Sequence, residues 1–580
     1  MKLKVVISDR IRFSKKLLPK KMILKRYDRA VYDEPKCDSC ENRPERHNDL
    51  CDNCPAFVGR YRFFSKTEEK AGIWSVPQGD YIAVVNTLRN KYPDIKVVDK
   101  RERLPFKHNI KFTGTLYGAG ETDDDGRPRA NQKKAVKNWL RYEHGILRAA
   151  PRTGKTVMAT YLYCKLQQKT VIIASQKEWL KQFYETAVGR APPTFRGNKN
   201  VRLGRVSPRR KAVTNIPELQ RKTGKEIIRY IDKFSQLVEA KENYDIVLMT
   251  YQALMRDPER ITKYLNGRYS FCIVDEGHKG SAPAFLRVLA QLNMAARLTL
   301  TATDKRKDSR DKFGEMIYGP VVSTSKTTAM VPHINFIDTN IKLKPMPKRW
   351  STALRRVCYN TERNKLLVRN IFADLRAGHR AIIVPLSYIQ HIEGLTKMIN
   401  RQAMINNKKR DEDWPITLAR SYHGKTDRDE ILHWVDSKKW DIPNKALSKE
   451  ERGPAPRVLV ARDSMIKEGI DFARPTSMHI TIPMSGNSRA GAPAFYQLTN
   501  RVCTPIANKK QPVVRVYIDQ VNMFRGAISG LLWHEIYPNS NLKKLSGGNY
   551  YLSKENYMIA KILTKKLTDK KASIFDGSWV

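Results

Sequence analysis

Short runs of β-branched and apolar residues alternate with stretches of helical periodicity along most of this chain, and this rhythm constrains the fold most strongly. In residues 129–330 the runs are Thr170–Ala174, Ile246–Thr250, Phe271–Val274 and Leu298–Thr301. From about 345 to 520 the pattern recurs, with runs at Ala381–Pro385, Val458–Ala461, Met478–Ile482 and Val513–Ile518. Strands that alternate with helices indicate a parallel sheet. We therefore expect an α/β protein with two parallel-sheet lobes in tandem.

Changes in charge and composition divide the chain into blocks. We expect a basic module with clustered cysteines at 1–57, a small mixed α+β domain at 58–118, lobe 1 at 119–335, lobe 2 at 336–520 and a basic C-terminal extension at 521–580. Two long polar insertions, Gly189–Lys241 and Gln402–Arg457, interrupt the lobes. They are interpreted either as solvated surface excursions or as surfaces that contact a nucleic-acid strand.

The charge balance points to a polyanionic partner. The chain has 108 Lys and Arg against 58 Asp and Glu, a formal net charge of +50. This excess is typical of nucleic-acid-binding proteins, although a coating protein without an enzymatic site has the same balance. No apolar stretch is long enough to span a membrane, and the N-terminus lacks a signal-peptide pattern. We expect an intracellular protein without a membrane partner, in the cytoplasm of a bacterial or infected host cell or associated with the nucleoid.

One segment has the form of a phosphate-binding loop. Residues Ala149–Thr156 read AAPRTGKT, with alanine at the first glycine position of the motif. The segment follows the apolar run Gly145–Leu147 and precedes a helical stretch, Val157–Gln167. This is the strand–loop–helix context that the motif requires, although a chance match remains the alternative for the segment taken alone.

Each residue of this loop has a definable task in binding ATP. Gly154 would let the backbone approach the phosphates, and successive backbone N–H groups at Arg152 and Thr153 would face the anion. Lys155 would reach the β- and γ-phosphates, and the hydroxyl of Thr156 would bind magnesium. The sequence therefore predicts an ATP and magnesium site.

A second segment completes this site. Residues Phe271–His278 read FCIVDEGH, an apolar strand that ends in two carboxylates. The end of such a strand lies at the nucleotide crevice of an α/β sheet, where Asp275 would hold magnesium and Glu276 would orient and deprotonate the attacking water. Two adjacent acids after a buried strand are costly unless a metal ion and water use them.

The order of these motifs resembles superfamily 2 helicases of the DEAH-like type, in the UvsW-like and XPB-like group of branched-DNA helicases and translocases. The resemblance covers about residues 80–520 and implies two RecA-like lobes with ATP bound between them. It also implies catalytic roles for His278, the last residue of the second motif, and for Arg501, which would meet the γ-phosphate. The second arginine of the family falls on Thr504, and Arg489 is the candidate substitute.

The resemblance implies further nucleotide contacts outside the phosphate loop. In the segment Arg129–Gln132, asparagine stands where the family has tyrosine, and the glutamine would read adenine. The remaining nucleotide-binding candidates are Arg129, Gln132, Gly469, Asp471 and Gln497.

The family's strand-facing motifs also have counterparts here. They follow the sheet strands of both lobes, where side chains would contact mainly the phosphates of a nucleic acid. The candidate residues are Ser175, Thr250, Tyr251, His423, Gly424 and Arg462.

The N-terminal cysteines have the spacing of a zinc site. Cys37 and Cys40 form one CxxC pair, Cys51 and Cys54 form another, and ten residues separate the pairs. Four thiolates at this spacing suit one structural zinc ion. Disulfides are the alternative, and His47 is an alternative ligand.

Together these features predict an ATP-dependent DNA helicase or translocase with ATP, magnesium and zinc as cofactors. Branched, forked or duplex DNA is the expected partner, with single-stranded DNA or RNA and replication, recombination or transcription proteins as further partners. A transcription- or RNA-directed ATPase is the alternative. A third reading is a DNA-coating protein with a decayed ATP site, and the intact Lys155, Thr156, Asp275 and Glu276 argue against it.

Overall fold

The computed structural model of this chain describes most of its 580 residues. The positions outside the description are 1–3, 8–9, 33–56, 63–65, 123–128, 151–152, 190–210, 240–243, 278–282, 302–310, 326–328, 411, 413, 416, 425, 427–429, 432–433, 436–455, 468–471, 473, 487–491, 506–508, 544–547 and 567–580. The chain divides into two compact units. Unit 1 comprises Met1–Asp123 and Pro128–Thr327, and unit 2 comprises Asp124–Arg127 and Thr328–Val580.

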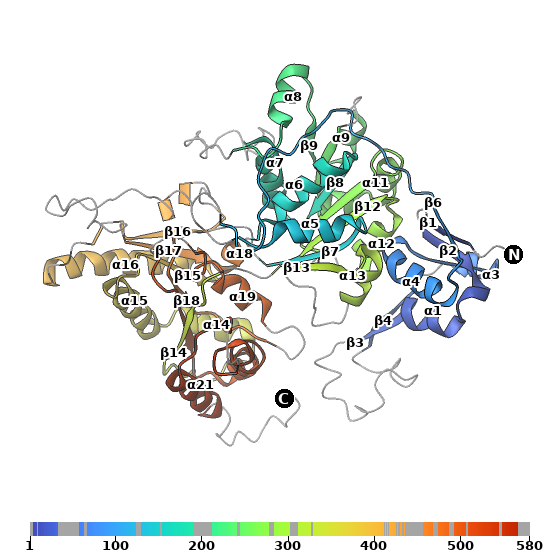
Figure 1. The fold of residues 1–580 in the computed structure, drawn as a ribbon. Helices are drawn as coiled ribbons and strands as arrows, with labels where there is room; N and C mark the ends of the chain where they lie inside the picture. Colours follow the sequence, from blue (N-terminus) through green and yellow to red (C-terminus); the bar gives the residue numbers. More distant parts are fainter. Residues whose placement is uncertain are drawn as a thin grey trace. The chain divides into compact units, whose positions relative to one another are not determined.

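A small mixed sheet begins unit 1 (Figure 1). Its strand order is β5-β2-β1-β6, with bounds β1 Lys4–Ile7, β2 Arg10–Ser14, β5 Ile73–Pro77 and β6 Lys96–Asp99. Helices α1 (Lys20–Tyr27) and α4 (Tyr81–Lys91) accompany the sheet. Strands β1 and β2 belong to the expected block 1–57, and β5 and β6 belong to the expected block 58–118. Residues of the two blocks therefore form one sheet. Sequence patterns alone do not give this pairing, because β1 and β6 lie far apart along the chain.

A separate pair of antiparallel strands flanks the cysteine-rich segment. These strands are β3 (Asp28–Tyr32) and β4 (Phe57–Arg62). The four cysteines of the expected zinc site, Cys37, Cys40, Cys51 and Cys54, lie outside the described residues. The zinc site therefore stays a prediction.

Lobe 1 is built on a seven-stranded parallel sheet, as expected. Its order is β13-β7-β12-β11-β8-β10-β9. The bounds are β7 His144–Ala149, β8 Thr170–Ala174, β9 Ile228–Ile231, β10 Ile246–Thr250, β11 Phe271–Asp275, β12 Ala296–Thr301 and β13 Val321–Ser325. The helices are α5 Gln132–Leu140, α6 Lys155–Leu166, α7 Lys177–Val188, α8 Ile216–Thr223, α9 Phe234–Glu239, α10 Tyr251–Arg256, α11 Pro258–Leu265, α12 Pro283–Gln291 and α13 Asp311–Tyr318.

Both faces of this sheet are buried, which explains why its strands read as continuous apolar runs. All five residues of β8, β10 and β11 are buried. Alternate residues point to opposite faces. Ile173 and Val274 join the hydrophobic cluster that contains α12 residues, whereas Ile172 and Ile273 join the cluster that contains α5 and α6 residues.

The first insertion contributes to the sheet of lobe 1. Its segment Ile228–Ile231 forms β9, which pairs in parallel with β10, and Ile228 and Ile231 are buried. This part of the insertion is therefore not a solvated surface excursion. The run is short and carries an arginine, so its hydrophobic pattern is weak in a strongly basic context.

Lobe 2 has a six-stranded parallel sheet of order β14-β19-β18-β15-β17-β16. The strands are β14 His333–Asp338, β15 Ala381–Leu386, β16 Ala419–Tyr422, β17 Arg457–Arg462, β18 Ser477–Ile480 and β19 Val513–Ile518. Its helices are α14 Trp350–Cys358, α15 Thr361–Arg376, α16 Ile389–Arg410, α18 Asp463–Lys467 and α19 Pro493–Thr499. The expected α/β fold with two RecA-like parallel-sheet lobes is confirmed.

The C-terminal extension continues from lobe 2 and shares its core. It contains a 3₁₀ turn Asn522–Phe524, α20 Arg525–Leu531, a π-helical turn Leu532–Ile536, a 3₁₀ turn Tyr537–Asn539 and α21 Lys554–Lys566. Leu531, Leu532 and Leu563 belong to the hydrophobic cluster that contains Val514 and Val516 of β19. The extension is therefore packed as part of unit 2. Among the described residues of the whole chain, helices long and apolar enough to cross a membrane are absent.

Candidate functional site

The phosphate loop lies where the sequence predicts it, between β7 and α6. Gly154 precedes α6 with φ of 83°, a left-handed conformation that glycine adopts without strain. The first turn of α6, which begins at Lys155 and Thr156, contains no acidic residue. The N-terminal N–H groups of this helix therefore form an end that favours an anion. Arg152 lies outside the described residues.

The side chain of Gln132 supports this loop. Gln132 is almost fully buried, and its Nε2 donates to the carbonyl oxygen of Thr153 at 2.9 Å. A Cβ atom at Gly154 would lie 2.2 Å from the same Nε2. A side chain at position 154 would therefore displace the Gln132 amide from Thr153, in addition to the strain of the positive φ. Gln132 thus fixes the loop, and its reading of adenine stays a prediction.

Tyr117 is a nucleotide-site candidate that sequence reasoning missed. Its backbone N–H donates to Oε1 of Gln132 at 3.2 Å. The guanidinium carbon of Arg129 lies 5.7 Å from the centre of the Tyr117 ring. Asn131, which replaces the tyrosine of the family, instead caps α5 by accepting the N–H of Lys134. An aromatic ring is thus present near Gln132, and only the tertiary structure brings it there.

The two predicted carboxylates follow β11 at the same edge of the sheet as the phosphate loop. Nζ of Lys155 lies 2.9 Å from Oε1 of Glu276, and both side chains are largely buried. The backbone N–H of Glu276 donates to Oδ1 of Asp275 at 3.0 Å. Glu276 has φ of 50°, a left-handed conformation that is strained for this residue type. Strain of this kind is common where a side chain must be held in one direction for function.

Neighbouring strands hold these carboxylates in place. The hydroxyl of Tyr251 donates to the backbone oxygen of Asp275 at 2.6 Å. Burial, followed by the nearby Tyr318, raises the pKa of Tyr251 well above its usual value, so the hydroxyl remains a donor. A Cβ at Gly277 would lie 2.2 Å from Cγ2 of Thr299. His278 lies outside the described residues.

The strand-contact candidates of lobe 1 have contacts within the lobe. Oγ1 of Thr250 accepts the N–H of Ala253 and caps α10. Tyr251 stacks on Phe285 with ring centres 4.2 Å apart. Within the described part of the chain, the buried Oγ of Ser175 makes no hydrogen bond. The assignments of Ser175, Thr250 and Tyr251 as strand contacts stay predictions.

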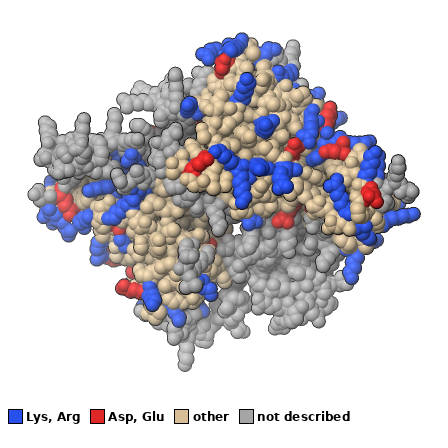
Figure 2. Space-filling view, viewed as in Figure 1, with Lys and Arg blue, Asp and Glu red and all other residues tan. Residues whose placement is uncertain are grey.

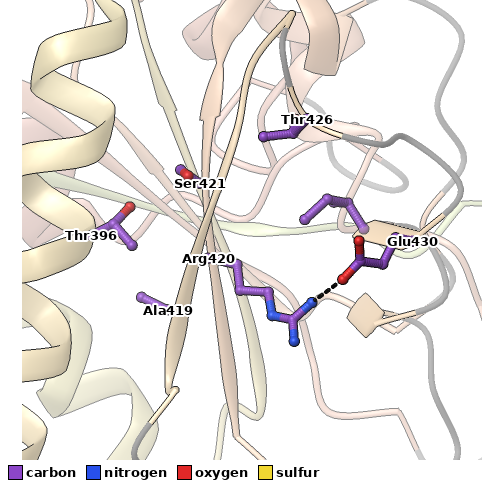
Figure 3. Close-up of a pocket in the computed structure, with 7 residues that line it drawn as sticks. Thr396, Ala419, Arg420, Ser421, Thr426 and Glu430 are labelled. Atoms are coloured by element: carbon purple, nitrogen blue, oxygen red, sulfur yellow. Dashed lines mark hydrogen bonds and ion pairs between the residues drawn. The ribbon is translucent and has the colours of Figure 1, made fainter. Parts of the chain in front are cut away.

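Lobe 2 presents a pocket of about 380 Å³ beside its edge strand β16. Figure 3 shows the side chains of Thr396, Ser421 and Thr426 around it, with Arg420 paired to Glu430 at 2.8 Å. The predicted strand-facing residues His423 and Gly424 directly follow β16. His423 is buried, and its Nε2 lies 3.4 Å from Oε1 of Glu393. Arg462, at the end of β17, is exposed.

The predicted arginine motif lies on and after α19. Gln497 is on the helix, and the N–H of Arg501 donates to the carbonyl oxygen of Leu498 at 2.9 Å. Thr504, where the family has its second arginine, donates its hydroxyl to the carbonyl oxygen of Phe472 at 3.0 Å. Phe472 directly follows Asp471, so this bond joins two predicted nucleotide motifs. Gly469, Asp471 and Arg489 themselves lie outside the described residues.

Groups of three or more His, Cys, Asp or Glu arranged as metal ligands are absent from the described residues. Magnesium in an ATP site takes several of its oxygens from water and phosphate. The small donor set of Thr156 and Asp275 fits that requirement.

Residues 125–306 match the protein family described as "Type III restriction enzyme, res subunit". The matched region contains the phosphate loop, Gln132 and the carboxylates after β11. This family belongs to helicase superfamily 2. The chain carries a superfamily 2 helicase domain. Domains of this kind hydrolyse ATP. The match ends at residue 306, just after β12 of lobe 1.

Several solved structures of helicases and of a restriction-enzyme subunit are similar to this chain. Mycobacterium smegmatis Lhr, bound to ssDNA and AMP-PNP, is 16% identical with a TM-score of 0.40, over 71% of this chain and 49% of that one. T4 UvsW is 15% identical with a TM-score of 0.32, over 90% of both chains. A putative HsdR subunit of a type I restriction enzyme from Vibrio vulnificus is 13% identical with a TM-score of 0.40, over 67% of this chain and 62% of that one. No curated protein sequence matches the chain significantly.

The helicase domain also carries a basic groove outside the ATP site. Its lining residues are Leu116, Lys133, Val136, Lys137, Leu140, Arg141 and Tyr161, around a pocket of about 380 Å³. Figure 2 shows Lys and Arg gathered in the part of the view where α5 lies. Cations above an apolar and aromatic floor suit a nucleic-acid strand, because they can meet phosphates while the floor meets bases or sugars.

Proposed function

We propose that this protein is an ATP-dependent DNA helicase or translocase that remodels or unwinds branched or duplex DNA in recombination, replication or repair. The observation that carries the proposal is the pairing of Lys155 and Glu276 at one edge of the lobe 1 sheet. A phosphate-loop lysine and the carboxylate of the water-activating motif meet in a helicase superfamily 2 domain. The chain therefore has the parts required to turn over ATP.

The residues of this chain divide the work at the ATP site. Lys155 and the N-terminal N–H groups of α6 would bind the phosphates, and Thr156 and Asp275 would hold magnesium, which would supply positive charge to the phosphate oxygens. Glu276 orients the attacking water and takes up its proton. In this structure Glu276 pairs with Lys155, so we expect phosphate to compete with Glu276 for the lysine. Arg501 supplies positive charge at the γ-phosphate.

Nucleic acid as substrate is supported by charge and by surface shape. The net charge is +50, and α5 with its cap contributes Lys133, Lys134, Lys137 and Arg141 without any acidic residue. The α5 groove and the pocket beside β16 give each lobe a candidate strand-binding surface. Contacts of this kind are mostly to phosphates, so binding should depend weakly on sequence and steeply on salt.

The deciding experiment measures ATP hydrolysis with single-stranded DNA, duplex DNA, forked DNA and RNA at one fixed salt concentration. Lys155→Ala serves as the inactive reference, and Lys165→Ala, an exposed position on the same helix, is the matched control. We expect forked DNA to stimulate ATP hydrolysis strongly in wild type and in Lys165→Ala, but not in Lys155→Ala. Stimulation by RNA alone would favour an RNA-directed ATPase. Absence of hydrolysis with all four nucleic acids would overturn the proposal.

A further inference from the structure

The C-terminal extension makes three separate contacts with the segment that leads into α19. The first is made by Glu535, on the π-helical turn Leu532–Ile536. Its carboxylate is 7% exposed, and Oε2 accepts the backbone N–H of Ala492 at 2.7 Å. Ala492 is the residue directly before the first residue of α19. A side chain of the extension thus holds the beginning of this helix.

The second contact is made by Tyr550, which is 1% exposed. Its hydroxyl donates to Oε1 of Glu535 at 2.7 Å. Its ring lies against Phe495 of α19, with ring centres 5.8 Å apart at 63°. Burial raises the pKa of Tyr550 well above its usual value, so the hydroxyl stays protonated and donates. Each oxygen of the Glu535 carboxylate therefore has its own donor.

The third contact is between two glycines. A Cβ atom on Gly530 of α20 would lie 2.4 Å from the backbone oxygen of Gly486. The backbone of α20 therefore lies directly against the chain that leads toward α19. Only glycine at position 530 permits this approach, because the obstructing atom belongs to the backbone and cannot rotate away.

The far end of α19 is closed by hydrogen bonds from the residues that follow it. The side-chain amide of Asn500 donates to the carbonyl oxygen of Tyr496 at 2.8 Å, and Sγ of Cys503 donates to that of Thr499 at 3.1 Å. The N–H of Arg501 is bonded to the helix through Leu498. Because these bonds close the C-terminal end of the seven-residue helix, we expect a shift at Ala492 to displace Arg501.

We propose that Glu535 is a positioning residue for ATP hydrolysis, which fixes α19 through Ala492 and Tyr550 and thereby sets the place of Arg501. The C-terminal extension is then an intramolecular brace on the arginine motif. This inference rests on the proposed function, because it takes Arg501 as the residue that neutralises charge at the γ-phosphate. A buried carboxylate is costly to maintain unless both oxygens are bonded, as they are here.

The test compares Glu535→Ala, Glu535→Gln and Tyr550→Phe with wild type in DNA-stimulated ATP hydrolysis. Glu535→Ala should lower kcat by about tenfold to a hundredfold, since a displacement of about 1 Å at a reacting group has effects of this size. The KM for ATP should change little, because the phosphate loop is untouched. Glu535→Gln should restore most of the rate, because its amide oxygen can accept from Ala492. Tyr550→Phe keeps the ring against Phe495 and should show a smaller loss.

A matched control separates positioning from stability. Ser477→Ala removes a buried hydrogen bond of the same lobe, the 2.6 Å bond from Ser477 to Asp374, which does not involve α19. It should lower the thermal midpoint comparably to Glu535→Ala and leave kcat unchanged. Combined with Arg501→Ala, the Glu535→Ala change should cause no further loss of kcat, because its effect acts through the arginine.

Three results would overturn the inference. The first is that wild type hydrolyses ATP and Glu535→Ala hydrolyses it at the same rate. The second is a loss of kcat of equal size in the Arg501→Ala background and in wild type. The third is a wild-type protein that does not hydrolyse ATP. This result would overturn the proposed function together with the brace, and the wild-type rate alone distinguishes it from the first two.

Discussion

Nζ of Lys155 lies 2.9 Å from Oε1 of Glu276, so the phosphate-loop cation and the candidate catalytic base form an ion pair. The pair is largely buried, and each partner satisfies a charge that would otherwise be costly in this environment. Binding of the γ-phosphate would take Lys155 and release Glu276 to the attacking water.

The first prediction concerns the two members of this pair. Lys155→Ala should lower ATP hydrolysis by about a hundredfold or more and weaken ATP binding, because it removes the phosphate-binding charge. Glu276→Gln should abolish hydrolysis yet bind ATP at least as tightly as wild type, since Lys155 no longer has to leave an ionic partner. Equilibrium ATP binding in the presence of magnesium, measured beside hydrolysis, distinguishes the two. Weaker binding by Glu276→Gln would contradict the competition between Glu276 and phosphate.

The second prediction concerns Gly154. Gly154→Ala places a Cβ 2.2 Å from Nε2 of Gln132 at φ of 83°, and should raise the KM for ATP by about tenfold or more. Gly224→Ala, at a similar positive φ in open space, is the matched control and should leave ATP binding unchanged.

The third prediction is a loss of stability in acid from buried histidines of lobe 2. Burial lowers the pKa of His379 and of His391 to about 4. Below about pH 6.5 the unfolded chain binds a proton at each histidine, whereas the folded lobe remains neutral until about pH 4. The free energy of unfolding should therefore fall as pH decreases across this window, by at most about 1.4 kcal/mol per pH unit for each histidine.

Asp374 extends this loss to lower pH. Burial alone would raise the pKa of its carboxyl, but hydrogen bonds from His479 and Arg515 outweigh burial and hold it well below its usual value. Its contribution is therefore present above the usual pKa of an aspartate and lost in stronger acid. Thermal unfolding of His391→Gln should show a shallower pH dependence than wild type, and His534→Gln, at an exposed position, should match wild type. Identical slopes in all three proteins would refute the assignment.

The fourth prediction is that the purified chain contains one zinc ion, bound by Cys37, Cys40, Cys51 and Cys54. Cys37→Ser should lower the zinc content measured by elemental analysis, because it removes one of four thiolates. Cys164→Ala, a buried cysteine on α6, should retain zinc. Zinc content unaffected by either change would exclude this ligand set.

Much of the sheet architecture could be predicted from the sequence. The runs Thr170–Ala174, Ile246–Thr250 and Val513–Ile518 coincide with β8, β10 and β19. The first two were visible because strands buried on both faces are apolar along their length, and the third because its run is long enough to stand out despite Arg515. The strand β9 was missed because it is a short strand at the sheet edge and carries an exposed-type residue, Arg229, in its centre.

The sequence by itself determined the two lobes, the phosphate loop and the order of the motifs, because these depend on local patterns and short spacings. Only the tertiary structure decided that Tyr117 lies beside Gln132, that Thr504 bonds Phe472 and that Glu535 holds Ala492. Each of these pairs joins residues that are separated along the chain and share no pattern. Their proximity arises from how helices and loops pack against the sheets, and packing depends on the whole set of buried side chains at once.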